Sequence, residues 1–200
     1  VGTPLSGQLA EQAADTVRIC INIWGKQHGV VAIHELIRAI LQDEPLKMRR
    51  LAEIFHVDVA ALHEIWVLCG MEDASGVNLE QMIAAARQCA ELVIGAVYDG
   101  NPVMSLSTPH SLRETERVME EILHQALPGS PDAVLVRCSG LSNTTNCCEA
   151  YQLTLENLED ARRIYPHKRL FLQGELEFAA SCRRRINEGE AAATRRTLPL

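Results

Sequence analysis

Residues 92–106 read LVIGAVYDGNPVMSL, and this stretch decides the fold. Two runs of β-forming residues, 92–97 and 103–106, flank the segment Asp99-Gly100-Asn101. Asp, Gly and Asn are the residues that a tight turn between antiparallel strands requires. The stretch therefore predicts a β-hairpin, and a sheet that contains a hairpin cannot be wholly parallel.

The segments before the hairpin add one strand and one helix. Ile65-Trp66-Val67-Leu68 is a compact run of β-forming residues bounded by Gly70, too short for a buried helix. Asn78 is a good helix cap, and the apolar residues that follow it recur at helical spacing up to Ala90. These signals predict a strand, a connecting helix and then the hairpin.

The segments after the hairpin repeat the alternation twice. Ser111 begins an amphipathic helix that closes at Pro128-Gly129, and residues 133–136 predict a strand. Tyr151 to Tyr165 marks another helix, which Pro166 ends before a last strand over 170–172. The order β-α-β-β-α-β-α-β predicts an α+β fold with a mixed five-stranded sheet flanked by helices.

Three helices are expected ahead of the sheet, as N-terminal linking helices. Apolar residues recur at spacings of three and four in the first of them, and two more are expected over 30–42 and 45–55. The first stripe either packs back onto the sheet or pairs with a second chain, and these alternatives stay open. Its candidate residues for homodimerisation are Leu9, Ala13, Val17 and Trp24.

Composition excludes several classes of function. The net charge of −7 opposes general attraction to nucleic acid. The seven cysteines show no C-x-x-C spacing, so we expect reduced, mostly buried thiols, no metal and no cofactor. No membrane-span-length apolar run and no signal-peptide pattern occurs, which predicts a cytoplasmic protein with no membrane partner.

Three segments together resemble a known family. Residues 36–41 (LIRAIL), residues 50–58 (RLAEIFHVD) and the strand 65–68 (IWVL) are similar to the opening of the GGDEF-like domain of sugar-diacid and purine-catabolism transcription regulators, the CdaR/PucR group. The helix from Glu149-Ala150-Tyr151 to Arg163 resembles a later helix of that domain. The similarity covers residues 33–182 and consists of hydrophobic patterns.

The resemblance implies a nucleotide-cyclase-like fold without cyclase activity. Active cyclases carry a Gly-Gly-Asp/Glu-Glu-Phe turn on the hairpin and an Asp at the end of the first strand, whose carboxylates hold Mg²⁺. Here the hairpin keeps one acid and one glycine, Asp99 and Gly100, and Pro102 follows the turn. The first strand runs into Cys69-Gly70, and Glu72 and Asp73 arrive late. We therefore expect no catalytic residues and no enzyme activity.

In the family, this domain lies between a sensor and a DNA-reading helix-turn-helix. The interpretation divides the chain into a helical linker and dimerisation region (1–62), a GGDEF-like domain (63–186) and a polar tail (187–200), with the chain truncated before its DNA reader. The predicted function is a non-catalytic regulatory and oligomerisation domain of a bacterial transcription regulator. It would relay a signal to a DNA-binding domain absent from this chain and would meet DNA only through that domain.

A second hypothesis for the function is a sensor domain that binds a small-molecule effector. Small polar residues gather in the loop 139–146, beyond the end of the fourth strand, where ligands of α/β proteins commonly bind. The alternative role of such a loop is to cap the helix that follows. The candidate ligand-binding residues are Ser139, Ser142, Asn143, Thr144 and Asn146. The run Arg183-Arg184-Arg185 is interpreted as a solvated face.

Overall fold

The structure is a computed structural model that describes residues 33–71 and 78–197, with side chains described as far as Ile186. The predicted dimerisation residues Leu9, Ala13, Val17 and Trp24 lie outside the described residues. Within them, the α+β class and the mixed five-stranded sheet flanked by helices are confirmed. The strands are β1 (Glu64–Cys69), β2 (Val93–Tyr98), β3 (Asn101–Leu106), β4 (Val134–Cys138) and β5 (Leu170–Leu172).

The sheet has the strand order β2-β3-β1-β4-β5. Strand β3 pairs antiparallel with both β2 and β1, β1 pairs antiparallel with β4, and only the β4–β5 pair is parallel. Consequently β1 and β2 run the same way with β3 between them, and β3 and β4 run the same way with β1 between them. The chain forms two interleaved β-α-β units, and β5 extends the sheet at the edge beside β4.

The hairpin predicted from residues 92–106 is confirmed. Tyr98 pairs with Asn101 across a two-residue turn, and both turn residues have positive φ, 47° at Asp99 and 78° at Gly100. Positive φ at both positions is the requirement of the turn that follows the right-handed twist of a hairpin. The Asp-Gly pair therefore sets the register of β2 on β3.

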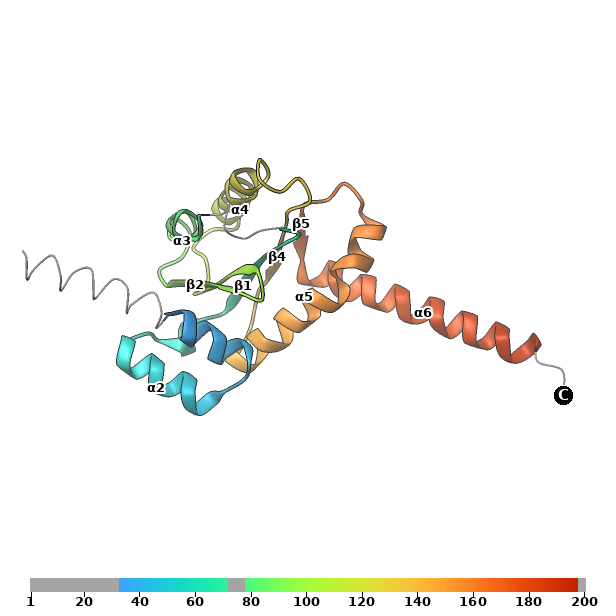
Figure 1. Ribbon diagram of the computed structural model, residues 1–200, viewed down its shortest axis with the longest axis horizontal. Helices are drawn as coiled ribbons and strands as arrows, with labels where there is room; N and C mark the ends of the chain where they lie inside the picture. The colour runs from blue at the N-terminus through green and yellow to red at the C-terminus, as the bar shows by residue number, and fades with distance from the viewer. Residues whose placement is uncertain (1–32, 72–77, 198–200) are drawn as a thin grey trace, which may run out of the picture.

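One face of the sheet is covered by α3 (Leu79–Ala86) and α4 (Leu112–Ala126), which lie together above the sheet in Figure 1. Trp66 of β1 is fully buried on this face. The cluster around it joins apolar side chains of the strands and of both helices, namely Leu68, Met82, Ala86, Met104, Leu106, Val118, Ile122 and Leu135.

The opposite face is covered by the helix over 33–41, by α2 (Pro45–Phe55), by α5 (Thr144–Ile164) and by the first part of α6 (Gln173–Thr197). A short 3-10 helix, Val59–Ala61, precedes β1. The residues buried in this second cluster include Leu36, Ile37, Leu62, Val67, Val136, Tyr151, Phe171, Leu176 and Ala179. Two helical layers therefore enclose the sheet.

Two helices differ from the sequence expectations. Helix α5 begins at Thr144, about two turns before Tyr151, because the side chain of Asn143 accepts a hydrogen bond from the Asn146 backbone N–H and caps it. Helix α6 follows β5 directly, where the sequence analysis expected no helix after the last strand. Its outer half extends away from the sheet (Figure 1).

Within residues 33–71 and 78–197, no helix combines the length and the apolar character needed to cross a bilayer.

Candidate functional site

A pocket of about 340 Å³ lies where the carboxyl ends of the two parallel strands meet. Arg137 near the end of β4 is in register with Leu172, the last residue of β5, so the segments that follow the two strands start side by side. Helix α5 starts after the first of these segments and α6 after the second. The pocket is lined by Ser139, Gly140, Leu141, Asn146, Glu149, Ala150, Leu153, Gln173 and Glu177.

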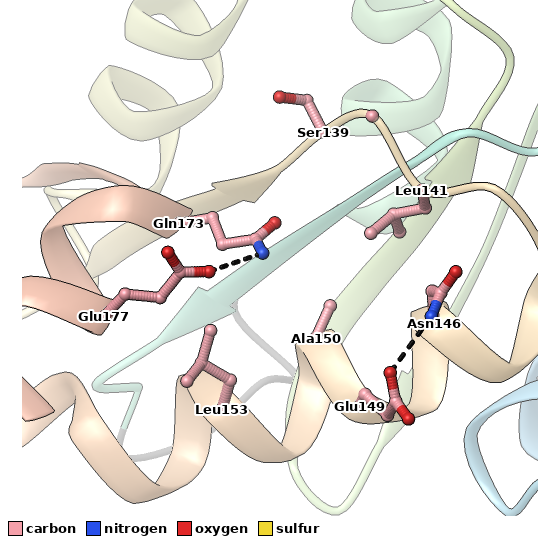
Figure 2. Close-up of a pocket in the computed structure, with 9 residues that line it drawn as sticks. Ser139, Leu141, Asn146, Glu149, Ala150, Leu153, Gln173 and Glu177 are labelled. Atoms are coloured by element: carbon pink, nitrogen blue, oxygen red, sulfur yellow. Dashed lines mark hydrogen bonds between the residues drawn. The ribbon is translucent and has the colours of Figure 1, made fainter.

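The pocket has a carboxylate at each of two sides and apolar side chains between them (Figure 2). On one side, Gln173 Nε2 donates to Glu177 Oε1 at 2.8 Å within α6. On the other, Asn146 Nδ2 donates to Glu149 Oε2 at 3.0 Å within α5. Ala150 and Leu153 lie between these pairs. Each amide holds one carboxylate oxygen in place, so the pocket is polar at its ends and apolar in the middle.

The structure separates the predicted ligand residues into two groups. Ser139 and Asn146 line the pocket. The others build the start of α5: Asn143 caps it, Thr144 is its first residue, and Ser142 Oγ donates to Asn146 Oδ1 at 2.6 Å. The loop thus serves as a helix cap and also as one wall of a pocket. Sequence reasoning missed Glu149, Gln173 and Glu177.

The loop that forms this wall is anchored to the segment before β1. The backbone N–H of Leu141 donates to the His63 carbonyl at 2.9 Å, and His63 Nδ1 lies 2.9 Å from the Leu141 carbonyl oxygen. Leu141 itself is buried in the core. The pocket wall is therefore tied at two points to His63, the residue that precedes the central strand.

Helix α6 carries the opposite wall and is fixed to α5 by a charged contact. Arg183 Nη1 lies 3.0 Å from Asp160 Oδ2, and Arg183 Nη2 donates to Asn157 Oδ1 at 3.2 Å. Asp160 is only 16% exposed, so this pair is partly shielded from water. Leu176 and Ala179 pack into the core on the same side of α6. Arg183, Arg184 and Arg185 are all exposed, as the interpretation of a solvated face expects, and Arg183 in addition contacts α5 from this face.

Two apolar side chains of α6 point away from this docked face. Phe178 is 51% exposed and Ile186 is 60% exposed. They lie eight residues apart, so they share one side of the helix. The helix thus joins the domain on one side and presents apolar groups to solvent on another.

The hairpin tip is packed against α5. The rings of Tyr98 and Tyr151 meet edge to face at a centroid distance of 5.4 Å, and Gln42 Nε2 donates to Tyr98 Oη at 3.3 Å. Burial is the main cause that raises the pKa of the Tyr151 hydroxyl. The end of β2 is therefore packed against α5, while the turn residues Asp99 and Gly100 are exposed.

A buried ion pair connects β1 with β4 on the face covered by α3 and α4. Arg137 donates through Nε to Glu64 Oε2 at 2.9 Å and through Nη2 to Glu64 Oε1 at 2.6 Å. Trp66 Nε1 donates to Glu64 Oε2 at 2.9 Å. The hydrogen bonds to Glu64 raise the pKa of the Arg137 guanidinium. The Glu64 side chain is 4% exposed and that of Arg137 is 11% exposed. Because water is largely excluded, each charge is stabilised by the other, and removing one would leave the other buried without a partner.

The described cysteines are free thiols, and most are buried. Burial raises the pKa of Cys69 to about 12 and that of Cys138 and Cys147 to about 11. Raised pKa values keep these thiols protonated and poorly reactive. Over residues 33–71 and 78–197, no group of three or more His, Cys, Asp or Glu side chains is arranged to hold a metal ion.

Comparison with known proteins gave no assignment: neither the protein-family models nor the curated proteins contain a significant match to this chain.

Proposed function

We propose that this chain is a non-catalytic regulatory and oligomerisation domain of a bacterial transcription regulator. In this proposal it adopts the nucleotide-cyclase-like fold of the GGDEF-like domains that its sequence resembles. The two interleaved β-α-β units, the hairpin between β2 and β3 and the degraded turn at Asp99-Gly100 support that assignment. The packing of Tyr98 on Tyr151 supports a structural role for the hairpin, because it fixes the end of β2 to α5.

The observation that carries the proposal is the arrangement of α6. Its first three turns are part of the domain, since Leu176 and Ala179 are buried and Arg183 pairs with Asp160. Its outer half leaves the body of the domain (Figure 1). An α-helix rises 1.5 Å per residue. A helix that is docked at one end and extended at the other therefore carries a displacement of its docked end along its whole length. We assign α6 as the output element toward the DNA-binding domain.

The input and assembly element in this proposal is the N-terminal stripe of Leu9, Ala13, Val17 and Trp24. If two copies of the chain pair through this helix, the dimer can have two conformations. A signal that favours one conformation then reaches other parts of the dimer as a shift in the populations of the two. The cytoplasmic location and the link to DNA through a separate domain are parts of the same proposal.

Light scattering on the full chain tests the assembly. We expect a dimer, with twice the chain mass of 22.1 kDa, that dissociates when Val17→Glu places a charge in the apolar stripe. Asn22→Glu adds the same charge on the opposite side of the expected helix and is the matched control, which should remain dimeric. A monomer at high protein concentration, or equal dissociation of the two variants, contradicts the proposed assembly.

The second candidate, a sensor for a small-molecule effector, is favoured by the pocket. The loop proposed for the ligand and the first two turns of α6 line the same pocket, through Ser139 and Asn146 on one side and Gln173 and Glu177 on the other. A ligand there would contact the output helix directly. The two candidates are compatible, because the pocket would supply the signal that α6 relays.

A further inference from the structure

We propose that α6 pairs antiparallel with the α6 of a second copy of this chain, along a row of side chains centred on Cys182. The inference rests on the proposed function, because it names a second contact surface within the proposed dimer. Phe178 and Ile186 are large apolar side chains that are 51% and 60% exposed. Cys182 is partly exposed and lies midway between them in the sequence. These three residues, four positions apart, form the apolar row of α6.

The spacing of the apolar row matches the commonest way in which two helices pack. Side chains four residues apart form a ridge, and such ridges of two helices interdigitate at a crossing angle of about −50°. The neighbouring row on α6 consists of Glu177, Ser181 and Arg185, all of them exposed. We call it the charged row. Its middle residue is small, so a ridge of another helix can enter the groove between the two rows.

The charged row determines the direction of the partner helix and favours a second copy as the partner. Its acid, Glu177, and its base, Arg185, lie four residues on either side of Ser181. In an antiparallel pair related by a two-fold axis, opposite ends of the same row meet. Arg185 would then lie beside Glu177 of the partner subunit at both ends of the contact. A parallel pair would bring arginine beside arginine and glutamate beside glutamate, which is unfavourable.

These two rows are not the side of α6 that docks onto its own domain. The docked side uses Leu176 and Ala179 in the core and Arg183 in the contact with α5. Glu177 accepts one hydrogen bond, from Gln173 Nε2 through Oε1 at 2.8 Å, so its Oε2 remains for a donor. The helix can therefore stay docked in its own domain while the rows contact a second copy.

The contact is too small to hold two chains together by itself. Stable interfaces bury about 1,200–2,000 Å² in total, more than one crossing of two helices provides. We therefore place the α6 contact within the dimer that the N-terminal stripe assembles, where the second copy is already at high local concentration. Dissociation of that dimer by Val17→Glu would separate the α6 helices as well.

Disulfide trapping in the full chain tests the surface and its direction. Two variants in a Cys182→Ser background each carry one new thiol, Phe178→Cys in one and Ile186→Cys in the other. Both replaced side chains are largely exposed, so both variants should fold. Co-expression gives mixed dimers, and diamide oxidises neighbouring thiols to a disulfide. We expect the mixed link at about tenfold the yield of either variant with itself, because a disulfide requires Cα atoms within about 7 Å.

The matched control is Leu155→Cys in the same background, since Leu155 is 43% exposed but belongs to α5. It should form no more dimer than the Cys182→Ser chain. Linking of Phe178→Cys to itself at the yield of the mixed pair means a parallel contact and overturns the proposal. Absence of the mixed link in a chain that light scattering shows to be a dimer overturns the α6 contact alone. A monomer in light scattering overturns the proposed assembly and this contact together.

The charged row is tested through the native Cys182, which should link to Cys182 of the partner subunit on oxidation. Arg185→Glu should lower the yield of that link about threefold, because two exposed ion pairs are lost and replaced by repulsion. The double variant Glu177→Arg/Arg185→Glu reverses both charges and should restore the yield. A higher yield for Arg185→Glu than for the unaltered chain contradicts the antiparallel direction, as does a double variant that links no better than the single one.

Discussion

Replacing Glu64 by leucine lowers the free energy of unfolding by about 3–5 kcal/mol. The substitution leaves the guanidinium of Arg137, 11% exposed, without its two hydrogen bonds to the carboxylate. It also removes the acceptor of the Trp66 indole N–H. A buried charge without a partner costs far more than an exposed ion pair contributes. Urea unfolding measures the loss as a lower midpoint at unchanged slope.

The matched control for this prediction is the double variant Glu64→Leu/Arg137→Leu. It removes both charges and fills the site with apolar groups, so we expect it to recover most of the lost stability. The difference between the double variant and the sum of the two single variants measures the coupling of the pair. A loss below about 1 kcal/mol for Glu64→Leu alone contradicts the account, because that is the range of an exposed pair.

Gly70→Ala is expected to destabilise the protein by about 3 kcal/mol or more. Gly70 directly follows β1 and has φ of +78°, where an L-residue is strained. A Cβ there would also lie 2.3 Å from the carbonyl oxygen of Asp132, and backbone cannot move aside as a flexible side chain can. The chain would have to separate the end of β1 from the segment that leads into β4.

Gly100→Ala separates the two causes of this loss. Gly100 has the same φ of +78°, but no atom lies within 4 Å of a Cβ built there. We therefore expect only the backbone cost, about 1–2 kcal/mol. Thermal or urea unfolding of the two variants in parallel provides the comparison. Equal losses for Gly70→Ala and Gly100→Ala would show that the contact with Asp132 does not matter.

Local sequence signals predicted the sheet well. The Asp99-Gly100 turn and the apolar runs beside it gave the hairpin, and Ile65 to Leu68 gave the central strand, because turn chemistry and β-forming residues act over a few neighbours. The start of α5 was placed too late, at Tyr151, since the apolar stripe is the stronger signal. The cap at Asn143 was the available signal for the true start.

The features that depend on distant pairs were not predictable in this way. Glu64 looks like an ordinary polar residue until β4 brings Arg137 beside it, 73 positions along the chain. The pocket residues Glu149 and Glu177 come from two helices, and only the parallel pairing of β4 with β5 places the starts of those helices together. Arg183 likewise acquires its partner Asp160 from α5. Sequence patterns within one segment carry no information about such pairs.

Native-state hydrogen exchange along α6 tests most directly the central claim that this helix is a rigid output element of the domain. The account predicts that backbone amides between Leu176 and Arg184 exchange as slowly as those in the middle of α5, because the two helices open as one unit. Exchange of those amides at the rate of an unfolded peptide, while β1 stays protected, would contradict it. A helix that opens independently of the domain cannot relay the domain's state.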